Sequence, residues 1–312
     1  METEITAIPP LSPGETSLLD MHSVLNLLNV LHGELTLLGL HLADDPELLQ
    51  AALARCRQFQ NELHDPAAAL RQAEAHAEMQ ALINREVTHC LERHPRHQDD
   101  PEVQESRANI GAVLRVFEVR AQEILTRAKA PQAWLIMSID ELQADFRQVF
   151  STMEKHSRGR YRIMHNLARQ DVTDYYLDFK IESVTEPLII LPLVFKDVMR
   201  DLLANARKYT RPGGSINAGL ALTETELRFS VQDSGCGIPA EEIQTVVHYG
   251  KRGSNVGEVR TMGGGFGLTK AFLVTRRMGG RFWIRSVLGQ GTRIRIAIPR
   301  PAGVGLQPAS AA

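Results

Sequence analysis

The sequence predicts an α+β fold in which an all-α helical bundle is followed by an α/β sandwich. In the N-terminal half, apolar residues recur at steps of three and four, which is the period of a buried helix face. From residue 160 onward, runs of alternating apolar and polar residues, typical of half-buried strands, are interspersed with amphipathic helical stretches. Glycine clusters separate these later runs, and a chain of 312 residues is long enough for two domains.

The composition disfavours several classes of protein. A formal net charge of −2 gives no overall field toward nucleic acid or an acidic membrane, and 5% aromatic residues leave few side chains for base stacking. Cys56, Cys90 and Cys236 form neither a metal-binding spacing nor an even set for disulfides, so we expect a reducing compartment. We recognise no signal peptide and no apolar run of about 20 residues. The sequence therefore predicts a cytoplasmic protein with no nucleic-acid partner and no membrane insertion.

The helical bundle is expected to span residues 16–158, after a flexible arm of residues 1–15. Its first helix, from about Glu15 to Leu42, carries a heptad seam, the pattern of a helix buried against other helices. The seam consists of Met21, Val24, Leu28, Leu31, Leu35, Leu38 and Leu42. Because this seam has more apolar surface than one partner helix can cover, we expect a homodimer through the N-terminal helices.

Four further helices are predicted from their N-terminal signals. Asp–Pro pairs beginning at Asp45, Asp65 and Asp100 each supply an N-cap and a first helical residue. Ser138 and Glu141 form a capping box for a last helix. The predicted helices span about 46–64, 67–94, 101–129 and 138–157. No strand is expected before residue 160.

The second domain is expected to span residues 159–300 and to be followed by a disordered tail, 301–312. Its strands are predicted at 161–165, 175–182, 215–222, 226–233, 281–287 and 292–298. Helices at 192–209 and 266–278 form a layer on the mixed sheet, and residues 239–262 form a lid.

Three short motifs in this domain suit a nucleotide. The helix Asp201–Thr210 carries Asn205, whose amide oxygen suits Mg²⁺. A strand ends at Asp233, whose carboxylate can accept a hydrogen bond from an exocyclic amine such as adenine N6. In Gly263–Lys270, glycines let the backbone approach phosphates, and the following helix presents free N–H groups. Each motif alone is more often a loop, a turn or a solvated helix residue, and their order in one stretch favours the nucleotide site.

In this order the motifs resemble the ATP-binding domain of sensor histidine kinases, within the GHKL (Bergerat-fold) ATPases. Asp201–Thr210 is similar to the N box of that family, Asp233–Gly237 to its first glycine box and Gly263–Leu268 to its second. Ser286–Thr292 is similar to its closing signature. The resemblance covers about residues 160–300 and implies ATP and Mg²⁺ as cofactors.

The resemblance also implies roles for individual residues. Asn205 is expected to be the Mg²⁺ ligand, Asp233 to read adenine with support from Thr292, and Lys208 to reach phosphate or ribose. Other residues expected to line the nucleotide pocket are Tyr209, Gly235, Gly237, Ile238, Gly263, Gly265, Phe266, Gly267 and Leu268. The lid cations are Lys251, Arg252 and Arg260.

Asp201 departs from the common pattern. It lies one helical turn before Asn205 on the same face. Many histidine kinases carry Asn at this position, whereas ATP-hydrolysing relatives carry an acid that polarises water. Whether this chain also hydrolyses ATP is therefore left open.

The N-terminal helix carries a stretch that resembles the phosphoacceptor box of these kinases. The matching residues are His22, Val24, Asn26, Leu28, Leu31 and Gly33. The resemblance implies that His22 is phosphorylated at an exposed position and that Asn26 positions water for removing phosphate from the regulator. Ser23 replaces the acid that would take the imidazole proton, so slow phosphotransfer is expected. His32 is a second candidate, and a solvated bundle histidine is the alternative to both.

The leading hypothesis is a soluble ATP-dependent protein-histidine kinase of a two-component system, which passes its phosphoryl group to a separate response regulator. One alternative is a nucleotide-responsive adaptor or anti-sigma-like switch, or a response-regulator phosphatase, supported by Ser23. A second is a protein-serine kinase of the same ATPase family, in which a helical bundle is also joined to this domain. The sequence identifies neither the signal nor the cognate regulator, nor the role of the extra helices at 67–157.

Overall fold

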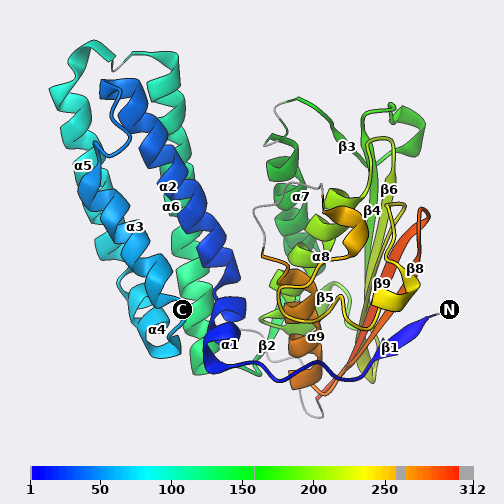
Figure 1. The fold of residues 1–312 in the computed structure, drawn as a ribbon. Helices are drawn as coiled ribbons and strands as arrows, with labels where there is room; N and C mark the ends of the chain where they lie inside the picture. Colours follow the sequence, from blue (N-terminus) through cyan, green and yellow to red (C-terminus); the bar gives the residue numbers. More distant parts are fainter. Residues whose placement is uncertain (1, 98, 156, 158, 258–263, 302–312) are drawn as a thin grey trace. The chain divides into compact units, whose positions relative to one another are not determined.

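A computed structural model of the protein describes residues 2–97, 99–155, 157, 159–257 and 264–301 (Figure 1). The chain divides into two compact units. Pro10–Ala130 form the helical unit, and residues 1–9 together with 131–312 form the sheet unit. Lid residues 258–262 and the expected tail from residue 302 onward lie outside the described residues.

The helical unit is a bundle of long helices around one apolar core. Its helices are α1 (Pro13–Asp20), α2 (His22–Ala43), α3 (Gln50–Glu62), α4 (Pro66–Glu74), α5 (His76–Arg93) and α6 (Pro101–Lys129). Phe59 of α3 meets Phe117 of α6 edge-on, with ring centroids 5.8 Å apart. Both rings are fully buried, so they anchor the centre of this core.

The heptad seam of α2 is confirmed as a buried face, but it is covered within one chain. Its seven residues are between 0% and 4% exposed and belong to the core shared with the other helices of the unit. The expectation that the seam needs a second copy to cover it is therefore wrong.

Helix boundaries in the unit follow capping chemistry only in part. Asp65 accepts a hydrogen bond from the Ala68 N–H and opens α4 as predicted. The first helix is broken at Met21, and the helix expected at 67–94 is broken at Ala75 into α4 and α5. The helix expected from residue 46 begins at Gln50. These breaks carry no proline or glycine, which is why the sequence did not reveal them.

The sheet unit contains a seven-stranded mixed sheet in the order β1-β8-β9-β7-β6-β4-β3. Its strands are β1 (Thr3–Ile5), β3 (Ile163–Met164), β4 (Tyr175–Ser183), β6 (Ser215–Leu222), β7 (Glu226–Asp233), β8 (Arg281–Val287) and β9 (Gly291–Pro299). The β3–β4 and β4–β6 pairs are parallel, and the others are antiparallel. A separate antiparallel pair joins β2 (Trp134–Ser138) to β5 (Leu188–Pro192). Short 3₁₀ turns lie at Pro95–His97, Leu167–Arg169, Ala240–Glu242 and Ser254–Val256.

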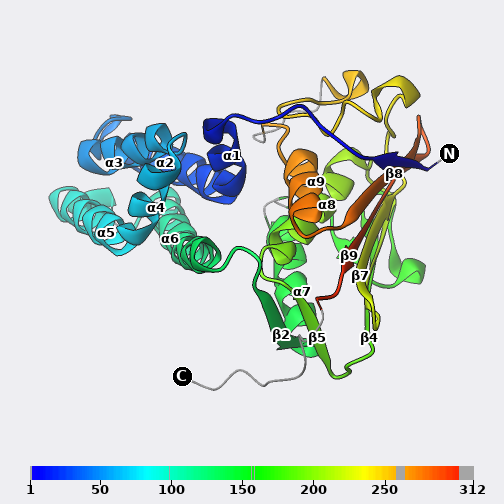
Figure 2. The same cartoon turned by 90° about the horizontal axis from the view of Figure 1, so that it is seen from below.

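Three helices cover one face of this sheet (Figure 2). They are α7 (Ile139–Lys155), α8 (Phe195–Tyr209) and α9 (Gly267–Arg277). Phe195 of α8 packs edge-on against Phe229 of β7 and Phe272 of α9 against Phe282 of β8. The predicted helical layer on a mixed sheet is confirmed, and β6 and β7 have the predicted bounds.

The domain boundary differs from the prediction. The helical unit ends at Ala130 rather than residue 158, because α7 belongs to the sheet unit. Phe146 of α7 is 1% exposed and packs against Phe179 of β4. The strand β2 was missed, so the expectation of no strand before residue 160 is wrong. Its pairing partner, β5, lies about 50 residues further along the chain, beyond the reach of a local pattern.

The N-terminal arm is also more ordered than expected. Residues Thr3–Ile5 form β1, which pairs with β8 at the edge of the sheet, and Ile5 is fully buried. Glu4 accepts hydrogen bonds from the Arg281 guanidinium, at 2.9 Å from Nε. Ser12 and Glu15 then form a capping box that opens α1. Three strand residues are too few to show a period, so only the partner strand reveals them.

Candidate nucleotide-binding site

Helix α8 presents a polar face above a strongly apolar one. Its buried residues include Phe195, Val198, Met199, Leu202, Leu203 and Ala206. Asp201, Asn205 and Lys208 remain half-buried beside this apolar face. They follow the spacing of one side of a helix, so the structure groups them as the sequence predicted.

Asn205 lies against the start of α9. A Cβ atom added at Gly267 would lie 2.9 Å from Asn205 Nδ2, so the Asn205 amide lies directly against the start of α9. The second glycine box and the N box are thus in direct contact. Gly263 of that box lies outside the described residues.

The carboxylate of Asp233 is held by two backbone donors at the end of β7. Its Oδ1 accepts hydrogen bonds from the Gly235 N–H at 2.9 Å and the Thr292 N–H at 3.1 Å. Both bonds use the same oxygen, and among the described residues none donates a hydrogen bond to Oδ2. Burial raises the pKa of Asp233 to about 6, although the two N–H groups oppose that rise.

Gly235 makes this arrangement possible. A Cβ at this position would lie 2.5 Å from the Tyr209 carbonyl oxygen and 2.8 Å from Asp233 Oδ1. The Cys236 N–H also donates to the Tyr209 carbonyl. The end of α8 and the first glycine box are therefore joined through backbone contacts.

Ser286 is a member of the site that the residue assignments omitted. Its hydroxyl accepts from the Ile238 N–H at 2.8 Å and lies 2.9 Å from the Thr292 hydroxyl. It thereby links the residues after the first glycine box to the strand that supports Asp233. Ser286 is the first residue of the closing signature, and this position in the sequence could have indicated that it belongs to the site. A polar cavity of about 180 Å³ opens beside Asp233, Ser286 and Thr292.

Cations gather near the end of α8. Burial, followed by the charges of Arg252 and Arg207, lowers the pKa of Lys208 to about 8. Arg252 of the lid segment is therefore close enough to Lys208 to act on it electrostatically. The ammonium of Lys208 lies 4.9 Å from the centroid of the Tyr209 ring, whose own pKa is raised by burial. Lys251 is exposed, and Arg260 lies outside the described residues.

The remaining predicted pocket residues surround the glycine boxes. Phe266 packs against Tyr249 with ring centroids 4.8 Å apart. Ile238 and Leu268 are partly buried against the core of the sheet unit. Gly237 and Gly265 both have positive φ.

The donors fit a magnesium–nucleotide complex. Among the described residues, no group of three or more His, Cys, Asp or Glu side chains forms a ready metal site. Mg²⁺ usually keeps several waters and takes only one or two protein ligands beside substrate phosphates. The half-buried amide of Asn205, next to Asp201, matches that requirement.

Lys270 of α9 is a second residue that the site assignments missed. Its side chain is 2% exposed, and its Nζ lies 3.1 Å from Asp201 Oδ2. A lysine within the otherwise largely apolar buried face of a helix was the signal in the sequence. Buried lysines are rare unless they are paired.

The two acceptor candidates lie in the helical unit. His22 is 9% exposed, and its Nε2 lies 3.2 Å from the Asn26 amide nitrogen. The expectation of an exposed His22 is therefore wrong for this conformation, since the residue follows the break at Met21 instead of continuing a straight helix. His32 is half-buried, about three turns further along α2.

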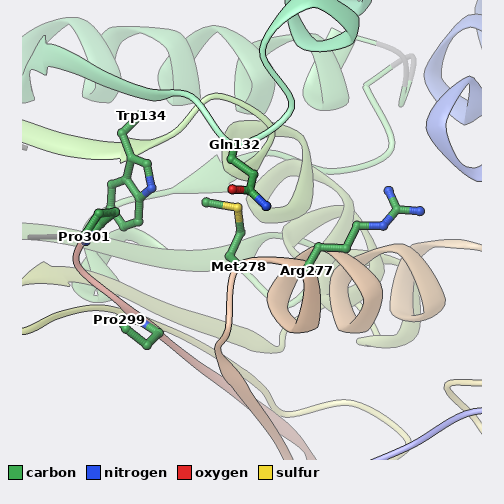
Figure 3. Close-up of a pocket in the computed structure, with 6 residues that line it drawn as sticks. All are labelled: Gln132, Trp134, Arg277, Met278, Pro299 and Pro301. Carbon is green, nitrogen blue, oxygen red and sulfur yellow. The ribbon is translucent and has the colours of Figure 1, made fainter.

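A separate cavity of about 360 Å³ contains none of the motif residues. It is lined by Gln132, Trp134, Arg277, Met278, Pro299 and Pro301. Figure 3 shows the side chains of Gln132 and Met278 extending toward one another, with Arg277 directed away from them. Its walls are mainly apolar and carry no carboxylate.

Comparison with known proteins identifies the sheet unit. Residues 192–302 match the family of histidine kinase-, DNA gyrase B- and HSP90-like ATPases. The chain is 30% identical to the virulence sensor protein BvgS of Bordetella bronchiseptica over 57% of its own length and 15% of that protein. It is 30% identical to the adaptive-response sensory kinase SasA of Parasynechococcus marenigrum over 60% of its length and 49% of that kinase. The chain thus spans half or less of these relatives.

The catalytic domain of the histidine kinase ThkA aligns with 54% of this chain and 97% of its own, at 22% identity and a TM-score of 0.37. That structural likeness is too low to carry an argument. The family match and the sensor kinase relatives confirm the predicted resemblance. Residues 192–302 thus form a histidine kinase-, DNA gyrase B- and HSP90-like ATPase domain, and the chain is similar to sensor histidine kinases.

One helix of the described residues is long and apolar enough to span a membrane. It is α2, which is 22 residues long with a mean hydropathy of 1.3. The expectation that the sequence has no apolar run of about 20 residues is therefore wrong, judged by the length and composition of α2. Core helices pass the same test, and the seam of α2 is buried against its neighbours.

Proposed function

We propose that this chain is an ATP-dependent protein-histidine kinase of a two-component system, which transfers its phosphoryl group to an aspartate of a separate response regulator. The Asp233 network supports this best. Gly235 and Thr292 fix one carboxylate oxygen, and the other oxygen is left to accept a hydrogen bond from adenine N6. The names of the relatives, which are sensor proteins and kinases, support the same conclusion.

ATP is proposed to lie between α8, the two glycine boxes and the lid segment. Asn205 would hold Mg²⁺, which neutralises and orients the phosphates when bound. Lys208 and Arg252, which are close enough to interact electrostatically, supply positive charge, and the exposed Lys251 precedes Arg252 in the lid segment. This division of roles places the base at Asp233 and the phosphates toward the start of α9.

His22 is the proposed phosphoacceptor. Its neutral imidazole attacks the γ-phosphorus, the bond to the ADP oxygen breaks, an N–P bond forms and the imidazole proton leaves to a base. Ser23 offers no carboxylate for that proton, so transfer is slow. Because His22 is 9% exposed, the first turn of α2 has to rearrange before the imidazole can react.

The burial of His22 favours a second candidate function. A nucleotide-responsive adaptor, or a phosphatase of the response regulator, needs no exposed phosphoacceptor. Asn26, which contacts His22, would orient the hydrolytic water in a phosphatase. Both candidates keep the ATP site and differ in what the helical unit does.

Incubation with γ-labelled ATP separates these functions. A protein phosphate that is labile in acid and stable in base indicates phosphohistidine, and its loss in His22→Ala with ATP affinity retained supports the kinase. An acid-stable phosphate would indicate a serine kinase. Binding without any labelling would contradict the kinase and favour the adaptor or phosphatase.

A homodimer is proposed through a surface other than the seam. Leu37 and Leu40 of α2 are 43% and 37% exposed, and Val116 and Val119 of α6 are 45% and 53% exposed. The two helices lie side by side in the bundle (Figure 1). Light scattering should show a dimer at tens of micromolar that dissociates in Leu37→Glu/Val119→Glu, and a monomeric wild type would contradict the proposal.

We place the protein in the cytoplasm. The seam of α2, its most apolar face, is buried inside the helical unit, which leaves the exposed face to contact water or a second copy. The three cysteines remain unpaired, as expected of a reducing compartment.

A further inference from the structure

Four charged side chains are packed together where α9 meets α8. Lys270 lies 3.1 Å from Asp201 Oδ2 and 3.7 Å from Asp197 Oδ2. Arg200 Nη1 lies 3.2 Å from Asp197 Oδ1. The two carboxylates and two cations face one another in pairs, and charged groups tolerate burial better when they are paired.

Lys270 is the most deeply buried member of this cluster. Its side chain is 2% exposed, against 7% for Asp197 and 22% for Asp201. Its neighbours Ala271, Phe272 and Val274 are core residues. An apolar side chain at position 270 would complete this core without any desolvation of charge, so packing alone does not account for a lysine.

The contact with Lys270 gives the two oxygens of Asp201 different environments. Oδ2, the oxygen nearest to the ammonium, is fully buried. The side chain as a whole keeps 22% exposure, so its exposed part lies away from Oδ2. Lys270 therefore holds one end of the carboxylate by an ion pair, without a hydrogen bond, and leaves the other end accessible.

The accessible end lies beside the proposed phosphate site. Asp201 precedes Asn205 by one turn of α8, and Asn205 touches Gly267, which precedes Lys270 by three residues in α9. The Asp201–Lys270 contact and the Asn205–Gly267 contact are thus neighbours along the same helix pair. A carboxylate here can face a group that attacks the γ-phosphate.

We propose that Lys270 is a positioning residue for ATP hydrolysis, which orients Asp201 so that its free oxygen receives the attacking water. The inference rests on the proposed binding of ATP. In the reaction, a water oxygen bonds to the γ-phosphorus, the bond to the ADP oxygen breaks, and the water proton passes to Asp201. Without Lys270, Asp201 and Asp197, one turn apart, repel each other and Asp201 turns toward solvent.

The test measures γ-phosphate release by the full chain in a His22→Ala background, so that phosphate cannot come from phosphohistidine. Lys270→Met and Asp201→Asn should each lower kcat on the order of 10- to 100-fold, with KM and ATP affinity nearly unchanged. Lys270→Arg, which keeps the cation, should restore most of the rate. Lys196→Met is the matched control, because Lys196 lies on α8 with Asp201 but forms its ion pair with Asp145 of α7, away from the site.

The double variant Asp201→Asn/Lys270→Met should release phosphate at the rate of Asp201→Asn alone, because the two residues act as a unit. This comparison holds even where Lys270→Met by itself fails to fold, since the double variant loses one charge of each sign. A further loss in the double variant, an unchanged kcat in Lys270→Met, or a failure of arginine to rescue would overturn the inference.

Labelling separates this inference from the proposed kinase. If the protein with intact His22 is labelled but its His22→Ala variant releases no phosphate, the role of Lys270 is refuted and the proposed kinase activity is not. If phosphate release depends on Lys270 but the chain is never labelled, the role of Lys270 is supported and the proposed kinase activity is refuted.

Discussion

The two units of this chain hold their polar residues in different ways. In the sheet unit, Asp233 is fixed by two backbone N–H groups, and the Asn205 side chain lies directly against Gly267 of α9. In the helical unit, His22 contacts Asn26 one turn away on the same helix. The proposed adenine contact is thus held by backbone groups, whereas the proposed acceptor lies at the start of a packed helix.

The largest effect is expected in the helical core. Phe59→Ala should destabilise the helical unit by about 3–5 kcal/mol, because a fully buried ring and its contact with Phe117 are lost. ATP affinity should not change if the units differ as described. Thermal unfolding and nucleotide titration of the same sample check both statements, and a parallel loss of ATP affinity would break the comparison.

Asp233→Asn should weaken ATP binding by about 1–3 kcal/mol, because an amide donor can then face the adenine amine. The apo protein should not lose stability near neutral pH, because the variant removes a buried charge whose pKa is raised to about 6. Calorimetric titration and unfolding measure the two quantities. Asp178→Asn, on the exposed face of β4, is the control and should leave ATP affinity intact.

ATP affinity should be greatest between about pH 6 and about pH 8. Below that range Asp233 gains a proton and loses its acceptor, and above it Lys208 loses its charge. On the acid limb below this range and the alkaline limb above it, ATP affinity falls by at most about tenfold per pH unit. Asp233→Asn should remove the acid limb and Lys208→Met the alkaline limb, and a flat profile in the wild type would contradict both assignments.

Titration of Asp233 affects the stability of the apo protein in the opposite direction to its effect on ATP affinity. The folded state binds the Asp233 proton more tightly than the unfolded chain, whose ordinary value is 3.8. This contribution to stability is therefore present at low pH and is lost as the pH rises through about 6. Stability and ATP affinity should move in opposite directions across that window.

The smallest effect is expected at the exposed lid cation. Lys251→Met should lower ATP affinity by roughly 0.2–1 kcal/mol, because exposed charges are screened by water and salt. The effect should shrink further at high salt. Lys129→Met, an exposed lysine of the helical unit, is the matched control, and an equal effect from it would remove Lys251 from the site.

Much of the site could be predicted because its residues occupy short motifs in a fixed order. Asp233, Gly235 and Thr292 meet as expected, and the strand alternation of β6 and β7 gave their bounds. The ion pair of Lys270 with Asp201 could not be predicted, since it joins helices that are about 70 residues apart. The burial of His22 depends on a helix break that has no sequence marker.

The pairing of β1 with β8 makes the helical unit an insertion between the first strand of the ATPase sheet and the rest of it. A fragment that begins at Pro131 would therefore lack part of its own domain. It would leave the backbone of β8 unpaired along an outer edge and would expose the pocket that Ile5 fills. Such a bare edge recruits strands from other copies, so the isolated ATPase fragment should aggregate unless a peptide of residues 1–9 is added back.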